Sequence, residues 1–369
     1  MIESLHVSGF KLFRDITLPR LGRLNLFVGE NNTGKSCLLE AINLYAGRTP
    51  ITDVLQTAAA RSGEAPGPWA PVDLTEEGTS LTHPVFDLFH RAGRAFTEGI
   101  IIEKIGDRSP LRVQCLPHRV VTDEEGYRRY IPLTQGDAIP PEGVEMALRV
   151  YRGDKQVGLI TRRLLPLRGR IPVGEAFANE DALSVAFLPA RGLSVEKASS
   201  MWDALIQGPG QELVLEWLRM LDARIEDLAY VAGRLGSSPR LALLKVEGQG
   251  RIPLRSMGDG LTKLFHIALA VASAPKGVLL IDEFENGLHW KVQGDLWIAL
   301  AKAAREFNVQ VFCTTHSRDC IESFAAAVKD AGPDGASIYR LERKGDDVFA
   351  TDLPLLNIDA AMREHEEIR

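Results

Sequence analysis

The octapeptide GENNTGKS, residues 29–36, constrains the possible fold more than any other segment of the chain. It matches the pattern GxxxxGK[ST] in full, and that pattern joins a strand to the first turn of a helix. The flanking sequence supplies both elements, because an apolar run, residues 24–28, precedes the loop and CLLEAINLY, residues 37–45, has helical spacing. Main-chain N–H groups of such a loop face a bound phosphate. The sequence therefore predicts a phosphate-binding loop in an α/β fold.

The residues of this loop have separate expected roles in nucleotide binding. Lys35 would place its ammonium on the β- and γ-phosphates, and the Ser36 hydroxyl would ligate magnesium. The remaining nucleotide contacts are expected along the loop and the helix start, from Gly29, Glu30, Asn31, Asn32, Thr33, Gly34 and Cys37.

A second motif, GVLLIDEFENGLHW, covers residues 277–290. Its apolar run predicts a buried strand that ends at two adjacent carboxylates, and ligands of parallel sheets bind at the carboxyl ends of strands. Asp282 is therefore expected to hold magnesium through water, as in a Walker B element. Glu283 is expected to orient or deprotonate the attacking water. In the alternative, the two carboxylates merely cap the following turn.

A third motif, VQVFCTTHS, covers residues 309–317 and predicts another buried strand. His316 follows that strand, where it could reach the γ-phosphate and hold the attacking water. The alternative is an ordinary surface or core histidine. In the same strand, Cys313 is expected to be a core residue, as is Cys320 beyond it, because their spacing fits no zinc pattern.

A fourth motif, RSMGDGLTKLF, residues 255–265, is a glycine-rich turn that opens a helix. Ser256 could simply cap that helix. The turn lies after the phosphate loop and just before the Asp282 strand, and this order resembles the ATP-binding-cassette (ABC) ATPases. By that resemblance Ser256 and Gly258 would contact the γ-phosphate of ATP held by another copy. ATP would then join two heads into a homodimer or a larger homo-oligomer.

The segments GFKLF, GENNTGKS, ENGLH and TTHS extend the match, because together they resemble the SMC-like cassette ATPases. Within these the chain is most similar to the OLD (overcoming lysogenization defect) family and its stand-alone AAA-family relatives. The resemblance is carried by residues 1–45 and about 240–320, with a looser match through VAFLPAR at 185–191. It implies that Lys11 approaches the nucleotide and that Asn286 and Gly287 form a D-loop across the dimer interface. Gln114 is a candidate Q-loop glutamine by position alone.

Two features depart from that family. The signature reads SMGDG instead of LSGGQ, and only residues 317–369 follow His316, which is too short for the Toprim nuclease domain of OLD nucleases. We therefore expect a stand-alone ATPase head. A separate effector protein would act on other molecules.

The expected fold is a single ABC-type ATPase domain over residues 1–369. Its class is α/β, a P-loop NTPase with an N-terminal antiparallel β meander, a mixed or parallel core sheet and an α+β insertion. The nucleotide-binding core is expected at 1–46 and 240–369. The insertion, 47–239, is expected to hold a β-rich segment, 98–190, and a helical segment, 197–234.

Hydrophobic periodicity and turn residues predict the individual elements. In the first two thirds we expect a meander over 2–28, helices near 51–61 and over 84–95, 197–206 and 211–232, and strands over 99–105, 111–116, 144–151, 157–161 and 185–188. In the last third we expect strands over 241–247, 277–281, 309–314 and 337–343, helices over 259–273, 291–306 and 318–329, and a tail with a strand pair and a terminal helix.

Composition limits the partners and the compartment. The chain has 43 Lys and Arg against 49 Asp and Glu, a net charge of −6, so DNA contact would need a local patch. One arginine cluster, residues 162–170, is either such a patch or a solvated surface. Four cysteines without CxxC spacing predict a reduced, cytoplasmic protein. No apolar run approaches the roughly 18–20 residues of a membrane helix, and the N-terminus lacks a signal peptide's apolar core.

The sequence thus predicts an ATP- and magnesium-dependent ATPase head that dimerises around ATP. By the family resemblance it would regulate or sense for a nuclease or Toprim-like effector in bacterial antiphage defence. One alternative is a RecF-like DNA-repair ATPase, against which the ENGLHW segment argues. Another is an ATP-bound scaffold with little turnover, against which the intact Glu283 argues. The preference for ATP over GTP follows from the resemblance alone.

Overall fold

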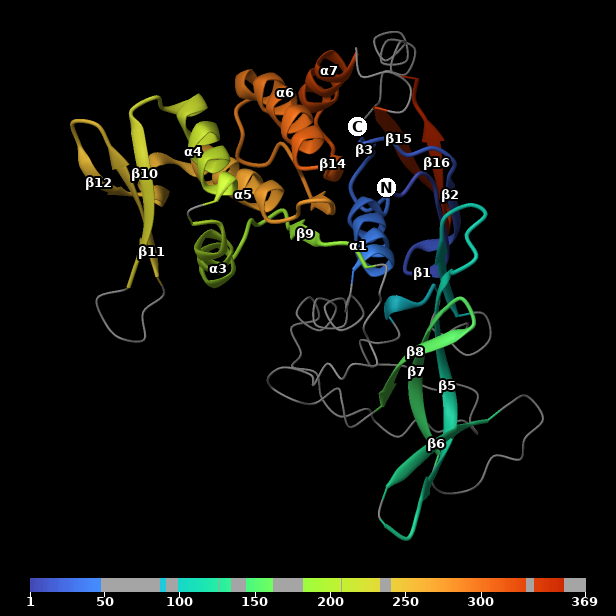
Figure 1. The fold of residues 1–369 in the computed structure, drawn as a ribbon. Helices are drawn as coiled ribbons and strands as arrows, with labels where there is room; N and C mark the ends of the chain where they lie inside the picture. Colours follow the sequence, from blue (N-terminus) through green and yellow to red (C-terminus); the bar gives the residue numbers. More distant parts are fainter. Residues whose placement is uncertain are drawn as a thin grey trace.

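The computed structural model describes residues 1–47, 87–90, 99–125, 127–133, 144–161, 182–206, 208–232, 240–329 and 335–354 (Figure 1). These residues form three β-sheets and the helices that pack on them, an α/β fold as predicted. The expected helix near 51–61, the arginine cluster at 162–170 and the expected terminal helix lie outside the described residues.

The central sheet has six strands in the order β16-β15-β3-β14-β13-β9. Five of them run parallel: β9 (Val185–Leu188), β13 (Val278–Ile281), β14 (Gln310–Thr315), β3 (Leu24–Val28) and β15 (Ala336–Lys344). The edge strand β16 (Asp347–Asp352) is antiparallel to β15. Every residue of β3, β13 and β14 is buried, as expected for parallel strands covered on both faces. The predicted, mainly parallel core sheet is confirmed, as is the strand pair of the tail.

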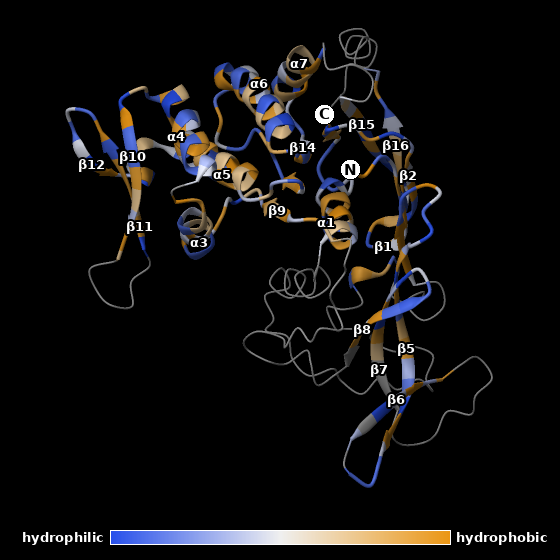
Figure 2. Ribbon diagram, viewed as in Figure 1, coloured by the Kyte–Doolittle hydropathy of each residue, from blue (hydrophilic) through white to orange (hydrophobic). Residues whose placement is uncertain are grey.

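Alternate residues of the central strands belong to two different hydrophobic cores. Leu26 and Val28 pack in a core with α5 (Asp259–Ala272), α6 (Trp290–Glu306) and α7 (Arg318–Val328). Phe27, between them, packs with α1 (Lys35–Ala46) on the opposite face. Figure 2 shows that α1, α5 and the strands between them are largely hydrophobic. The central strands are therefore buried on both faces of the sheet, and a functional site can form at their carboxyl ends.

The second sheet is antiparallel, with seven strands, and it extends away from the core (Figure 1). Its order is β2-β1-β4-β5-β7-β8, and β6 pairs with β5. Its strands are β1 (Leu5–Phe10), β2 (Phe13–Leu18), β4 (Ile100–Glu103), β5 (Leu111–Thr122), β6 (Arg128–Pro132), β7 (Val144–Arg152) and β8 (Lys155–Thr161). The N-terminal hairpin is confirmed, but the buried strand that follows it, β3, lies in the central sheet. The hairpin instead continues into strands that we had placed in the insertion.

The third unit combines helices with a three-stranded antiparallel sheet. It contains α3 (Val195–Leu205), α4 (Pro209–Leu221), β10 (Ile225–Val231), β11 (Leu241–Val246), β12 (Gly250–Pro253) and the short 3₁₀ helix η4 (Leu254–Met257). The predicted helix over 211–232 is wrong beyond residue 221. There the Asp222 N–H closes the last turn on the Leu218 carbonyl, and the following residues pair with β11. Long-range strand pairing overrides the local helical pattern.

The remaining predictions for described residues hold with small shifts in their boundaries, with one exception. The short helix expected over 84–95 is not α-helical at 87–90, where Phe89 forms a β-bridge with Phe10. The strands β6 and β12 were not predicted. Among the described residues, no helix is long and apolar enough to cross a membrane.

Candidate functional site

The phosphate loop connects β3 to α1 and its glycines are required by its shape. Gly29 has φ 149°, and a Cβ there would lie 2.4 Å from the Leu341 carbonyl oxygen of β15. Gly34 has φ 94°, and a Cβ there would lie 3.0 Å from the Phe13 ring. The Thr33 hydroxyl donates to the Glu30 carbonyl at 2.8 Å and closes the loop. Close packing from β15 and β2 therefore leaves space only for main chain at both glycines.

Lys35, in the first turn of α1, is buried and folds back over the loop. Its Nζ donates to the Gly29 carbonyl at 2.7 Å and to the Glu30 carbonyl at 2.6 Å. Burial lowers the pKa of Lys35, and the nearby carboxylates, foremost Asp282, oppose that shift. The Lys35 ammonium is thus buried and donates to two main-chain carbonyls of the loop. A bound phosphate could take the place of these carbonyls as the acceptor.

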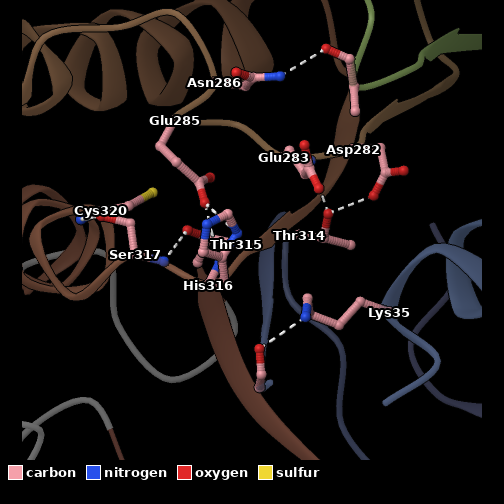
Figure 3. Close-up of polar contacts among 12 residues, drawn as sticks. Lys35, Asp282, Glu283, Glu285, Asn286, Thr314, Thr315, His316, Ser317 and Cys320 are labelled. Carbon is pink, nitrogen blue, oxygen red and sulfur yellow. Dashed lines mark hydrogen bonds and ion pairs between the residues drawn. The ribbon is translucent and has the colours of Figure 1, made fainter. Parts of the chain in front are cut away.

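Asp282 links the loop to the neighbouring strands, and Figure 3 shows its contact with Thr314 of β14. Ser36 Oγ donates to its two carboxylate oxygens at 2.9 and 3.0 Å, and Thr314 Oγ1 donates to Oδ1 at 2.7 Å. The parallel register of β3, β14 and β13 brings these residues together at one edge of the sheet. A hydroxyl and a carboxylate at this spacing are oxygen donors of the kind that Mg²⁺ binds. The predicted metal ligands Ser36 and Asp282 therefore fit that ion.

Glu283 follows in a left-handed conformation, with φ 50°. Its N–H donates to Thr314 Oγ1 at 2.8 Å, and its carbonyl accepts from Lys263 Nζ at 3.0 Å and from the Asn286 N–H at 3.1 Å. A non-glycine residue in this region costs on the order of 1–3 kcal/mol, so surrounding contacts must hold it there. Burial lowers the pKa of Lys263, which lies on α5. A buried ammonium from α5 thus fixes the main chain of Glu283.

His316 is held by Glu285 at the end of β14 (Figure 3). Glu285 Oε1 lies 3.1 Å from His316 Nδ1 and accepts the His316 main-chain N–H at 3.1 Å. Figure 3 shows Lys35, Asp282, Glu283 and His316 around one region, and Ser36 joins them through its hydrogen bonds to Asp282.

Sequence reasoning missed three residues of this cluster, Thr314, Glu285 and Lys263. Thr314 and Glu285 lie inside motifs that it had singled out, TTHS and ENGLH, so their polar character was a usable signal. Lys263 had a weaker signal, as a single lysine within an otherwise apolar helix.

The signature turn lies apart from the phosphate loop of the same chain. Ser256 is exposed in η4, and Gly258, with φ 96°, begins α5. In the described part of the chain, no hydrogen bond joins either residue to residues 29–36. The turn instead packs near the predicted D-loop, since a Cβ on Gly260 would lie 3.2 Å from the Gly287 carbonyl. Asn286 Nδ2 donates to the Ala190 carbonyl at 3.1 Å.

Lys11, Gln114 and Cys37 occupy different surroundings. Lys11 lies in the β1–β2 turn, where its ammonium is 2.5 Å from Glu40 Oε2 of α1. Gln114 lies in β5 opposite Arg149, in the antiparallel sheet. Cys37 is half-buried in the first turn of α1. Their roles in nucleotide binding stay predictions.

Cys313 and Cys320 are both fully buried in the core beside α6 and α7. Burial raises the pKa of the Cys320 thiol to about 12 and that of Cys313 well above its usual value. Both side chains therefore pack as small, protonated core residues, as predicted.

Two family matches cover the segments that build this site. Residues 1–60 match the family described as "AAA ATPase domain", and residues 157–319 match "AAA domain, putative AbiEii toxin, Type IV TA system". The first contains the phosphate loop, and the second contains the Asp282 and His316 strands.

One relative matches most of the chain and another matches about a quarter of it. The chain is 24% identical over 356 residues to the "ATP/GTP phosphatase" of Helicobacter pylori, and this match covers 89% of each of the two chains. It is also 33% identical over 95 residues to an uncharacterized protein, MJECL11, of Methanocaldococcus jannaschii, over 26% of this chain and 82% of that protein.

Among solved structures, the chain is similar to an SMC head bound to the C-winged helix domain of ScpA, with a TM-score of 0.48 and 15% identity over 98% of this chain and 99% of that one. It is also similar to the SMC head domain from Thermotoga maritima, with a TM-score of 0.43 and 14% identity over 95% and 98% of the two chains. Both family matches describe AAA domains and together they cover the residues that form this site, so the chain is an ATPase with AAA-type domains.

Proposed function

We propose that this ATPase is a head that dimerises around ATP and thereby controls a separate effector protein in bacterial antiphage defence. The observation that carries the catalytic part is the contact between Ser36 and Asp282, at 2.9 Å, next to Glu283 in the chain. Together with the Lys35 ammonium, this hydroxyl and the two carboxylates lie at the carboxyl edge of the sheet, where a nucleoside triphosphate would bind.

In this proposal each side chain has one task. Lys35 and the main-chain groups of residues 29–37 bind the phosphates, and Ser36 and Asp282 hold magnesium. When bound, the ion neutralises charge on the phosphate oxygens. Glu283 orients the attacking water and accepts its proton, and His316 contacts the γ-phosphate or that water.

Dimerisation is supported by the position of the signature turn. Ser256 and Gly258 are exposed and make no hydrogen bond to the phosphate loop within the described residues. We therefore infer that these residues complete the site of a second copy, with Asn286 and Gly287 at the interface. Each nucleotide would then contact two chains, so its binding would favour the dimer.

The effector and the defence role rest on different support. The matched family's description names a toxin–antitoxin system, and the OLD resemblance relates the chain to defence ATPases. The division into a core, residues 1–46 and 240–369, and an insertion, residues 47–239, stays a prediction. The shared sheet of β1, β4 and β5 suggests a route by which the β-rich part could transmit nucleotide state.

The proposal is tested by measuring hydrolysis and molecular mass together. Wild type and Glu283→Gln are assayed with ATP and with GTP, with and without duplex DNA, and Glu322→Gln on the exposed side of α7 is the matched control. We expect wild type and control to hydrolyse ATP, and Glu283→Gln to be inactive yet dimeric with ATP. Full activity of Glu283→Gln, or a mass that ATP leaves unchanged, would contradict the proposal. Stimulation by DNA would favour the repair alternative.

A further inference from the structure

We propose that Glu285 is a positioning residue that orients the His316 imidazole and selects its tautomer, so that Nε2 faces the nucleotide. This inference rests on the proposed function, in which His316 acts at the γ-phosphate. Glu285 itself touches neither substrate nor metal in this proposal.

One carboxylate oxygen of Glu285 holds His316 at two points. Oε1 accepts the main-chain N–H of His316 at 3.1 Å and lies 3.1 Å from the ring Nδ1. The first contact fixes the end of β14 against the turn after β13, and the second fixes the ring. Because a carboxylate can only accept hydrogen bonds, its position 3.1 Å from the ring favours the tautomer with the proton on Nδ1. In that tautomer the lone pair lies on Nε2.

The two partners differ strongly in exposure. The Glu285 side chain is 11% exposed, whereas that of His316 is 49% exposed. The other carboxylate oxygen, Oε2, is buried without a hydrogen-bond partner among the described residues. Polar interactions are stronger in such surroundings than in water, and among the described residues the His316 ring nitrogen Nδ1, 3.1 Å away, is the side-chain nitrogen paired with this carboxylate. The exposed side of the imidazole is left for the site.

The surrounding chain keeps Glu285 in place. Its carbonyl accepts the Leu288 N–H at 2.9 Å, and the preceding residue, Phe284, stacks on Trp297 of α6 with ring centroids 3.7 Å apart. The turn is thus anchored on both sides, and the carboxylate can direct the ring rather than follow it.

A carboxylate behind a histidine has a defined chemical effect. It fixes the tautomer, restricts rotation of the ring and stabilises the imidazolium if Nε2 takes up a proton. Here Nε2 can accept a hydrogen bond from the attacking water, or, when protonated, donate one to a γ-phosphate oxygen. Without Glu285 both tautomers and several ring orientations become accessible, and fewer molecules have the productive arrangement.

A double-mutant cycle separates this role from a purely structural one. The variants are Glu285→Gln, His316→Ala and the double variant, with Glu322→Gln as a control for replacing a carboxylate that pairs with Arg318 on the surface. Glutamine keeps an acceptor for the His316 main-chain N–H, so the fold should survive, which thermal unfolding checks. We expect Glu285→Gln to lower kcat about tenfold to a hundredfold, with KM within about twofold. The double variant should be no slower than His316→Ala. Losses that multiply would overturn the inference.

Nitrogen-15 spectra of the histidine rings provide a readout that does not depend on activity. In wild type the His316 signals should report a proton on Nδ1, and Glu285→Gln should show mixed or rapidly exchanging tautomers. An Nε2-protonated ring in wild type, or unchanged signals in the variant, would refute the role of Glu285. If wild type does not hydrolyse ATP, or if His316→Ala is fully active, the proposed function fails, while the spectra still decide what Glu285 does.

Discussion

The Ser36 hydroxyl donates to both carboxylate oxygens of Asp282, at 2.9 and 3.0 Å, although the two residues are 246 positions apart in the chain. The contact arises because β3 and β13 flank β14 in parallel, so their carboxyl ends meet at one edge of the central sheet. This contact joins the start of α1 to the motif at residues 277–290 that carries the two adjacent carboxylates.

Asp282→Asn should remove the magnesium dependence of nucleotide binding. The amide keeps one acceptor for Ser36 and Thr314 but loses the charge that attracts the cation. We expect hydrolysis to fall by at least about a hundredfold. Binding of a fluorescent ATP analogue should become the same with magnesium as with EDTA. Asp295→Asn, at an exposed position on α6, is the control. A variant that still binds more tightly with magnesium would contradict the assignment.

Gly29→Ala should abolish nucleotide binding and destabilise the fold. The added methyl would meet the Leu341 carbonyl at 2.4 Å, so the main chain of β15 or of the loop must move. We expect a loss on the order of 2–4 kcal/mol in the free energy of unfolding, measured with urea. Gly294→Ala in α6 is the matched control, because a Cβ added there would have no neighbouring atom within 4 Å and alanine favours the helix. Equal stability of the two variants would show that the close approach is unimportant.

Lys263→Met should slow hydrolysis without lowering thermal stability. The ammonium holds the strained Glu283 carbonyl at 3.0 Å, but its burial is unfavourable, which the lowered pKa of Lys263 reflects. Methionine fills the space and cannot donate. We expect kcat to fall about tenfold and the unfolding temperature to stay level or rise. Lys302→Met on the exposed side of α6 should change neither quantity. An unchanged kcat in Lys263→Met would show that the contact does not position Glu283.

His266 should make the protein less stable in mild acid. Burial, with the charges of Lys263 and Arg255, lowers the pKa of His266 from its usual 6.5 to about 4. Because the unfolded chain binds the proton more readily, stability is complete above pH 6.5 and falls as the pH drops toward about 4. The loss should be on the order of 2 kcal/mol after allowance for solvent screening. It is measured by urea unfolding at several pH values.

His266→Gln should flatten this part of the pH profile, because glutamine does not titrate and can still accept the Leu193 N–H. The contribution of His6 to stability should have the opposite pH dependence. Burial alone would lower its pKa, but hydrogen bonds to Asp15 and Glu103 raise it. The contribution of His6 is therefore present below its unfolded pKa and lost as the pH rises through the folded value. A profile in His266→Gln as steep as that of wild type would assign the acid sensitivity to other groups.

Local sequence carried much of the fold and the centre of the site. Continuous apolar runs identified β3, β13 and β14, the GxxxxGK[ST] pattern identified Lys35, and the polar residues after two of the runs identified Asp282 and His316. The strand assignments are confirmed because a strand buried on both faces has a distinct composition, and the end of such a strand has a fixed place in a parallel sheet.

What the sequence could not reveal depends on contacts between distant segments. Residues 225–231 continue a helical pattern, but β11 pairs with them and makes them a strand. Lys263 and Glu285 join the site through contacts with Glu283 and His316, which lie 20 and 31 positions away in the chain. The joining of the N-terminal hairpin to β4 likewise requires a pairing across nearly a hundred residues.

A complementation assay tests the proposed two-chain site most directly. Lys35→Ala and Ser256→Arg are each expected to be inactive, because one loses the phosphate contact and the other blocks the exposed signature turn. When they are mixed in equal amounts, half of the dimers should contain one site with both parts intact, so activity should recover to about a quarter of the wild-type rate. A mixture as inactive as its components, with heterodimers shown by mass, would contradict a site built from two chains.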